Sequence, residues 1–330
     1  MNLKEDFYQK ANSWWWTGRT DEGYPHNYFH QNITCVDAQN DTLPTPGENR
    51  GFGIVGYCCQ EGVRRNHGRI GAAHGPRAIR NMLGPLAVHY AKKPRLIDLG
   101  NIHCLHEEME ATQILLSKQV FNLLDSSYMP ILMGGGHDMA YGHFLGIQKF
   151  LAEKKKRLGI INLDAHFDLR INLKNGHSGT PFYQISQCYE KPQEDFHYLC
   201  LGIQQASNSQ LLFDTAKSLE VEYLLANQMT EKNLGVISES ISTFLSKIDQ
   251  VYLSIDLDGF ASAFAPGVSA PSPMGFTPQV AMEVIDQIAS SGKLLSMDIA
   301  ELNPTFDQDN CTARLAARLI NHTVTTLLAC

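Results

Sequence analysis

Three segments of the sequence concentrate carboxylates and imidazoles, and the densest is Asp164-Ala165-His166-Phe167-Asp168. Its polar residues alternate, and in an extended chain alternate side chains point to the same side. Two carboxylates and an imidazole held this close would repel and lose hydration unless a cation balanced them. A solvated surface strand is the alternative, but the preceding stretch Leu158–Leu163 has the composition of a buried strand. The segment therefore predicts a cation-binding cluster.

The other two segments are weaker signals on their own. Asp256 and Asp258 repeat the i, i+2 pattern after an apolar stretch, although such a pair at a strand end is often only a turn. His137 follows Gly134-Gly135-Gly136, and a tight turn with a structural histidine would explain it equally well. No Lys-Ser or Lys-Thr follows the glycines, so a phosphate-binding P-loop is excluded.

Taken together, the three segments offer four carboxylates, two imidazoles and no thiolate: His137, Asp164, His166, Asp168, Asp256 and Asp258. Such an oxygen-rich set suits manganese or a similar divalent ion better than structural zinc. Six ligands, some of them bridging, suit two ions that share a bridging water. The ions would lower the pKa of that water and present hydroxide to an electrophilic carbon. The predicted reaction class is metal-assisted hydrolysis.

The elements that must position these residues are short apolar strands alternating with helices. The expected strands are Gly53–Tyr57, Arg95–Leu99, Pro130–Met133, Gly159–Leu163, His197–Gly202, Val221–Leu225, Gln250–Ile255 and Lys293–Ile299. Helical segments include Gly75–Leu83, Glu107–Asp125, Ala140–Lys156, Glu231–Lys247 and Pro278–Ser290. This pattern predicts a single-domain, three-layer α/β/α fold around a mostly parallel sheet of roughly eight strands. The polar segments follow the carboxyl ends of strands, where open parallel sheets bind ligands.

Length and composition agree with one globular α/β domain. The chain has 330 residues, 43% hydrophobic and 18% charged, and we expect an irregular segment at 1–50 packed on a catalytic domain at 51–330. The 27 basic and 34 acidic residues give a net charge of −7, which argues against a nucleic-acid partner. Neither a secretory signal nor a stretch of about 18 apolar residues is present, so no membrane partner is expected. The eight cysteines include no Cys-x-x-Cys pair, which favours reduced thiols in the cytoplasm.

The segments Gly134–Asp138, Asp164–Asp168 and Ser254–Asp258 resemble, in order and spacing, the three metal-binding motifs of the arginase–agmatinase ureohydrolases. The resemblance extends from about residue 50 to the C-terminus. It implies two Mn2+ ions per chain held by the six residues named above, and a homo-oligomer. It further implies that Asp168 holds the bridging hydroxide and that Glu301 faces the cationic end of a small amidine or guanidino substrate.

Departures from the arginase pattern resemble one branch, the formimidoylglutamases of histidine degradation. Asp258 continues into Gly259-Phe260-Ala261-Ser262 instead of an Asp-Pro pair, and Ser178-Gly179-Thr180 stands where agmatinases tend to carry His-Gly-Thr. The resemblance implies hydrolysis of N-formimidoyl-L-glutamate to L-glutamate and formamide. Because Ser178 replaces the family's proton-shuttle histidine, the proton donor to the leaving group stays open.

A substrate with two carboxylates calls for arginines, whose planar guanidinium binds a carboxylate through two hydrogen bonds. We expect Arg170, Arg65, Arg69 and Ser178 to bind substrate, although Arg65 and Arg69 could instead belong to a solvated or inter-subunit loop. Alternative functions are a ureohydrolase that releases urea, a catalytically silent protein of the same fold and a single-metal amide deacetylase. Trp14-Trp15-Trp16 is expected to pack the N-terminal segment on the domain or on a subunit interface.

Overall fold

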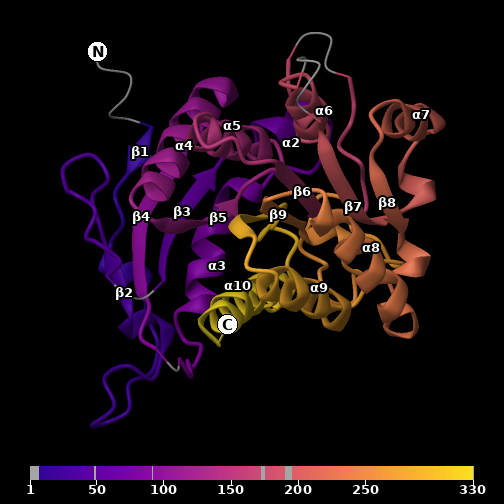
Figure 1. Ribbon diagram of the computed structural model, residues 1–330. Helices are drawn as coiled ribbons and strands as arrows, with labels where there is room; N and C mark the ends of the chain where they lie inside the picture. Colours follow the sequence, from indigo (N-terminus) through magenta and orange to yellow (C-terminus); the bar gives the residue numbers. More distant parts are fainter. Residues whose placement is uncertain (1–6, 48–49, 91, 172–174, 190–194, 330) are drawn as a thin grey trace.

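The apolar stretches of the sequence form one central sheet in the computed structural model, which describes residues 7–47, 50–90, 92–171, 175–189 and 195–329 (Figure 1). Eight strands make up most of it: β3 (Gly51–Cys58), β4 (Arg95–His103), β5 (Tyr128–Gly134), β6 (Leu158–Leu163), β7 (His197–Ile203), β8 (Glu222–Leu225), β9 (Gln250–Asp256) and β10 (Leu294–Ala300). They lie in the order β4-β3-β5-β10-β9-β6-β7-β8, and every neighbouring pair is parallel. All eight coincide with predicted strands.

Helices cover both faces of the sheet, so the predicted three layers are confirmed (Figure 1). On one face lie α4 (Met109–Asp125), α5 (Met139–Leu151), α6 (Pro181–Ser186) and α7 (Gln210–Ser218). The other face carries α3 (Gly75–Leu83), α8 (Leu234–Ser246), α9 (Pro278–Ser290) and α10 (Cys311–Ala329). Two buried apolar clusters, one on each side of the sheet, hold the layers together.

The strands that precede the polar segments are neighbours in space. In the sheet order, β5, β10, β9 and β6 follow one another directly. Because parallel strands end at the same edge, the residues after these four strands meet there. They are His137 after β5, Glu301 after β10, Asp256 and Asp258 at the end of β9, and Asp164 to Asp168 after β6.

The first fifty residues are less irregular than predicted, because two short strands in them extend the sheet. β1 (Tyr8–Gln9) pairs with β4 antiparallel, and β2 (Ile33–Cys35) pairs with β4 in parallel. The third residue of the tryptophan run anchors this segment: the buried Trp16 donates from Nε1 to Asp98 on β4 at 2.8 Å and stacks on Phe29. Trp14, in contrast, is 60% exposed.

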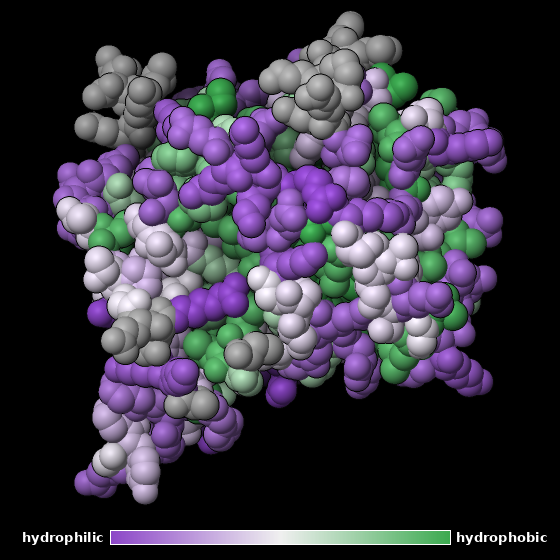
Figure 2. Space-filling view, in the orientation of Figure 1, coloured by the Kyte–Doolittle hydropathy of each residue, from purple (hydrophilic) through white to green (hydrophobic). Residues whose placement is uncertain are grey.

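The distribution of side chains on the surface is the one expected of a protein whose apolar residues are buried in the two clusters. Hydrophilic side chains predominate on the face in Figure 2, and hydrophobic ones appear between them in separate groups. Among the described residues, no helix has both the length and the apolar composition needed to cross a membrane.

Candidate metal centre

The three glycines before His137 are required by the close packing of the turn that follows β5. A Cβ on Gly135 would lie 2.1 Å from the backbone oxygen of Cys59, and one on Gly136 would lie 2.4 Å from an oxygen of Asp138. Without side chains, the backbone amides of Gly135 and Gly136 can donate to the backbone oxygens of Tyr57, in β3, and Cys59, directly after it. The turn thereby fixes His137 over the end of the sheet.

The segments that begin at Asp164 and at Asp256 reach the site through tight turns. The sequence analysis assumed an extended chain for the first of them, and the structure shows that this was wrong. The Asp164 carboxylate accepts the backbone N–H of His166 at 2.7 Å, and Asp256 accepts that of Asp258 at 2.8 Å. A carboxylate that binds the backbone two residues onward closes such a turn. The side chains still converge on one site, because the first residue of each turn ends a buried strand or follows it directly.

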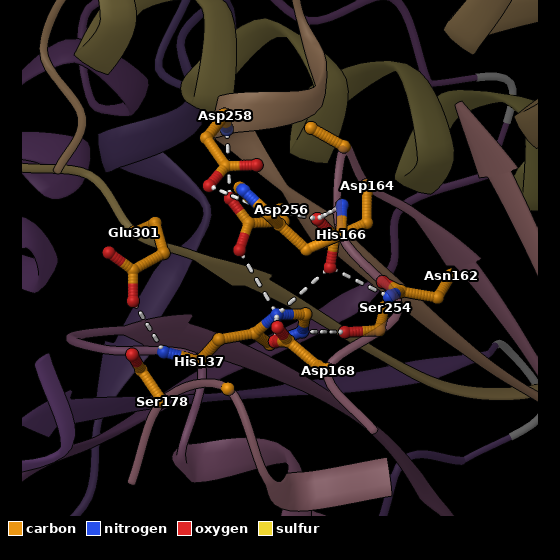
Figure 3. Close-up of polar contacts among 12 residues, drawn as sticks. His137, Asn162, Asp164, His166, Asp168, Ser178, Ser254, Asp256, Asp258 and Glu301 are labelled. Atoms are coloured by element: carbon orange, nitrogen blue, oxygen red, sulfur yellow. Dashed lines mark hydrogen bonds and ion pairs between the residues drawn. The ribbon is translucent and has the colours of Figure 1, made fainter. Parts of the chain in front are cut away.

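Four of the predicted ligands form a first cluster around the His137 ring (Figure 3). Nδ1 of His137 lies 2.9 Å from an oxygen of Asp168, 3.0 Å from one of Asp256 and 3.3 Å from one of Asp164. This nitrogen is buried and makes no hydrogen bond of good geometry, although three carboxylate oxygens surround it. The nitrogen lone pair and the carboxylate oxygens thus converge on one point, an arrangement that fits a metal ion bound by all of them.

A second cluster contains His166, Asp258 and again Asp164. Nδ1 of His166 lies 3.2 Å from Asp258 and 3.5 Å from Oδ1 of Asp164, whereas Oδ2 of Asp164 is the oxygen that faces His137. The two oxygens of Asp164 therefore point to different clusters. Ligand atoms in each cluster lie within 4.8 Å of one another, so the six residues could hold two ions with Asp164 as a bridge.

The electrostatics of the site demand positive charge. Burial, and then the charge of Asp164, raises the pKa of Asp168 to about 6. Burial and the charge of Asp256 raise the pKa of both Asp258 and Glu301 well above their usual range. Burial lowers the pKa of His137, but the close carboxylates of Asp164, Asp168 and Asp256 outweigh that effect and raise it. The centre thus takes up protons, and divalent cations would displace them.

A buried chain of hydrogen bonds orients His137. Its Nε2 lies 2.8 Å from the hydroxyl of Ser254, which donates to Oδ1 of Asp298 at 2.6 Å. On the other oxygen, Asp298 accepts from Tyr252 and from Nδ1 of His143. Against the effect of burial, the bonds from His143 and Ser254 lower the pKa of Asp298, so the carboxylate is ionised and accepts only.

This chain was not anticipated from the sequence. Because Asp298 takes the Ser254 proton, Ser254 presents a lone pair to His137. The Nε2 proton of His137 is then fixed, and Nδ1 is left as the nitrogen that could bind a metal ion. The alternation of Tyr252, Ser254 and Asp256 along β9 was an available signal, since the side chains of such residues share one side of the strand.

A cavity of about 320 Å3 opens over the two clusters, and the predicted substrate residues Arg69, Arg170 and Ser178 line it. The Arg170 side chain is exposed, and among the described residues it has no hydrogen-bond or ion-pair partner. Ser178 is buried and its hydroxyl accepts from Asn66 at 3.1 Å, which leaves its own proton free to donate. Glu301 lies at the edge of the clusters and accepts the backbone N–H of His137 at 2.9 Å.

The guanidinium groups of Arg65 and Arg69, also predicted to bind substrate, are bound to other parts of the protein. Arg65 does not line the cavity: its guanidinium is paired with Glu61 at 2.8 Å and Glu110 at 2.5 Å, so the structure does not bring it to a substrate. Arg69 lines the cavity, but it donates to the backbone oxygens of Val268 and Ser269 and stacks on a phenyl ring. Arg69 therefore holds its loop against a neighbouring loop.

Comparison with known proteins agrees with this geometry. A model of the arginase family matches residues 50–325. The chain belongs to the arginase family. It is 39% identical to formimidoylglutamase of Clostridium tetani over 97% of this chain and 96% of that protein, and 43% identical to formimidoylglutamase of Rhodococcus jostii over 94% of each.

Solved structures of this family share the fold. A crystal structure of a Trypanosoma cruzi formiminoglutamase variant with Mn2+ superposes with a TM-score of 0.76 at 26% identity, covering 85% of this chain and 94% of that one. Formimidoylglutamase from Bacillus subtilis superposes with a TM-score of 0.78 over 98% of each chain, and at 24% identity it supports the fold alone. The arginase-like fold predicted from the motifs is thereby confirmed.

Proposed function

We propose that the protein hydrolyses N-formimidoyl-L-glutamate to L-glutamate and formamide at a centre of two manganese ions. The observation that carries the proposal is a cavity with carboxylates at its base and a guanidinium in its wall, that of Arg170, with which no described residue pairs. Such a cavity suits a molecule with a cationic amidine at one end and carboxylates at the other. Relatives about 40% identical over nearly their whole length bear the name formimidoylglutamase.

The six clustered residues would hold the ions, with His137, Asp164, Asp168 and Asp256 at one position and Asp164, His166 and Asp258 at the other. When bound, two manganese ions supply Lewis acidity and a water that is activated at neutral pH. The oxygen-rich, thiolate-free donor set fits manganese. The orientation of His137 by Ser254 and Asp298 would keep its Nδ1 available to the first position.

Glu301 would bind the amidinium. One of its oxygens accepts the His137 backbone N–H, which leaves the other for the substrate's N–H groups. Its raised pKa indicates a carboxylate that gains from a cationic partner, and an amidinium supplies that charge together with hydrogen bonds. Glu301 is buried beside the clusters, so an amidinium whose N–H groups it binds would turn its carbon towards the attacking water.

Asp168 is the group best placed to move the proton. It lines the cavity, and its carboxylate belongs to the cluster that would hold the attacking water. We propose that its carboxylate accepts a proton from the attacking water and passes it to the glutamate nitrogen as the C–N bond breaks. Ser178 then has no proton to shuttle and binds substrate through its hydroxyl instead. Arg170 binds a substrate carboxylate.

The test is product analysis by NMR with the manganese-loaded protein. Formimidoyl-glutamate, arginine, agmatine and 4-guanidinobutyrate are incubated separately. We expect formamide and glutamate from the first compound alone. Urea from any other would point to the rival ureohydrolase activity, and ammonia with formyl-glutamate would mean that a different bond is cleaved. No product with any of the four, despite two bound ions, would contradict the substrate assignment.

We further propose that the protein works in the cytoplasm as a homo-oligomer. The seven described cysteines are all free thiols, which fits a reducing compartment. Light scattering of the purified protein tests the second part, and a single species with the mass of one chain would contradict it.

A further inference from the structure

His67 stands at the end of α2 (Glu61–Arg65) in a conformation that favours glycine. Its φ is +60°, and its N–H donates to Arg64 while the next N–H, of Gly68, donates back to Val63 at 2.8 Å. Helices commonly end in this way with glycine at the left-handed residue, because any Cβ there crowds the backbone. The chain places its glycine one residue later and keeps an imidazole at the strained position. That choice needs a reason outside local stability.

His67 is one of several residues with a left-handed backbone that line the cavity over the metal centre. Among the described non-glycine residues lining it, three have a left-handed backbone: Asp168 (φ +50°), Glu301 (φ +67°) and His67. The first two are the residues that we assign to proton transfer and amidinium binding. Strained backbone tends to gather where a side chain must be aimed for function. His67 shares this property with the two and lines the same cavity.

The loop that carries His67 is held rigidly. Asn303 donates to the backbone oxygens of Arg69 at 2.9 Å and Ile70 at 3.1 Å, and the backbone N–H of Arg69 donates to Ser269 at 2.8 Å. These bonds tie the loop to the segments that follow β9 and β10. The loop therefore keeps the backbone of His67 at the cavity wall.

The surroundings of His67 are positively charged. Arg170 lines the same cavity with an exposed guanidinium, and His177 lies close enough that, after burial, the charges of Arg170 and His67 lower its pKa. The base of the cavity, by contrast, is formed by carboxylates. An elongated substrate with its cation at the base would bring its two carboxylates to this wall. Of the two arginines that line it, Arg69 is bound to backbone oxygens, and Arg170 has no partner among the described residues.

We infer that His67 is a specificity-determining residue whose imidazole binds the γ-carboxylate of the substrate beside Arg170. The inference rests on the proposed function, because only a substrate with a second carboxylate gives this imidazole a partner. The histidine is then retained at a position where glycine would relieve backbone strain.

The experiment replaces His67 with glycine, which removes the imidazole and suits the backbone. Initial rates of the manganese-loaded enzyme are measured with formimidoyl-glutamate and with N-formimidoyl-L-norvaline, in which a methyl group replaces the γ-carboxylate. Since a hydrogen bond to a charged group contributes enough for about a tenfold change in binding, we expect KM for formimidoyl-glutamate to rise about tenfold. We expect kcat to stay within about twofold, KM for the norvaline compound to stay unchanged, and Tm not to fall.

His106→Gly is the matched control. His106 is also an exposed histidine with a left-handed backbone (φ +52°), but it does not line this cavity. Its replacement should leave both KM values unchanged. His67→Asn gives a second variant, because asparagine tolerates the left-handed region while lacking the imidazole.

The outcomes separate the two proposals. Wild-type enzyme that does not hydrolyse formimidoyl-glutamate would overturn the proposed function and this inference with it. An active wild type with unchanged KM in His67→Gly would overturn the inference alone. An equal rise in KM for both compounds would also overturn it, because the imidazole would then act on something other than the γ-carboxylate.

Discussion

Nε2 of His137 lies 2.8 Å from the hydroxyl of Ser254, and the direction of this hydrogen bond is set by Asp298 on the neighbouring strand. Asp298 can only accept, so the proton of Ser254 points to it and the proton of His137 points to Ser254. Ser254 and Asp298, which lie outside both candidate ligand clusters, thus leave Nδ1 of His137 as the nitrogen that could bind a metal ion.

Ser254→Ala should weaken manganese binding at the His137 position. Alanine removes the acceptor that holds the Nε2 proton, and loss of such a supporting contact typically costs 10- to 100-fold in metal affinity. Titration calorimetry with Mn2+ on protein stripped of metal measures the effect. Thr323→Ala, which removes another buried hydroxyl, on α10, is the control and should bind manganese as the wild type does. Equal dissociation constants for Ser254→Ala and the wild type would contradict the role of the serine.

Replacement of Asp164 should remove both ions, whereas replacement of Asp258 should remove one. The reason is that the two Asp164 oxygens face different clusters, but Asp258 belongs to the second cluster alone. Metal analysis by mass spectrometry after dialysis should give about two manganese ions per wild-type chain, about one for Asp258→Ala and almost none for Asp164→Ala. Asp249→Ala, at a surface ion pair, should retain two. One ion retained in Asp164→Ala would contradict the bridging assignment.

The stabilisation that manganese gives should grow as pH rises from 5 to 7.5. Burial raises the pKa of Asp168 to about 6 from an ordinary 3.8, so between these values the folded metal-free protein binds more protons than the unfolded chain. The stability that this carboxyl contributes is full below about pH 3.8 and is lost as pH rises through about 6. Metal ions, in turn, bind the deprotonated carboxylate.

Melting curves in EDTA and in saturating Mn2+ test this expectation, since histidines away from the centre titrate alike in both samples. The difference in Tm between the two should widen with pH. A constant difference over the whole range would show that protons and metal ions do not compete at this centre.

The sequence predicted the eight main strands and the six clustered residues because both depend on local patterns. Short apolar stretches formed strands in one sheet, and the carboxylates after them met because parallel strands end at one edge. The helix at Cys311–Ala329 was missed, although Leu315, Leu319 and Ile320 have helical spacing and are buried. The two N-terminal strands have only two and three residues and exist through pairing with β4, which no local pattern reveals.

Which arginine is free to bind a substrate carboxylate could not be predicted from local sequence patterns. The sequence favours Arg170, two residues from a predicted metal ligand, but leaves open whether Arg65 binds a carboxylate or belongs to a solvated or inter-subunit loop. The structure separates them, because Glu110, 45 residues away, reaches Arg65 and no described residue pairs with Arg170. Partners brought in by the fold decide which charge is available, and the sequence does not state them.

Arg170→Ala should raise KM for formimidoyl-glutamate by about tenfold or more, since it removes a cavity-wall guanidinium that has no partner among the described residues. Arg65→Ala provides the contrast. It breaks the pairs with Glu61 and Glu110, so it should lower Tm and leave KM within about twofold. Steady-state kinetics and melting curves of both variants measure these effects. An unchanged KM in Arg170→Ala would remove this residue from the substrate site.

Asp98→Asn should destabilise the whole domain without changing its catalytic constants. Asp98 is fully buried on β4, accepts two hydrogen bonds from Arg80 at 2.8 and 2.9 Å, and also holds Trp16. Asparagine leaves the buried guanidinium of Arg80 without its counter-charge, a change that costs about 3–5 kcal/mol and lowers Tm by several degrees. Because Asp98 does not line the cavity, kcat and KM measured well below Tm should match the wild type. Asp249→Asn, at the exposed pair with Arg157, should melt like the wild type, and equal melting of Asp98→Asn would mean that the N-terminal segment and β4 are held by apolar packing alone.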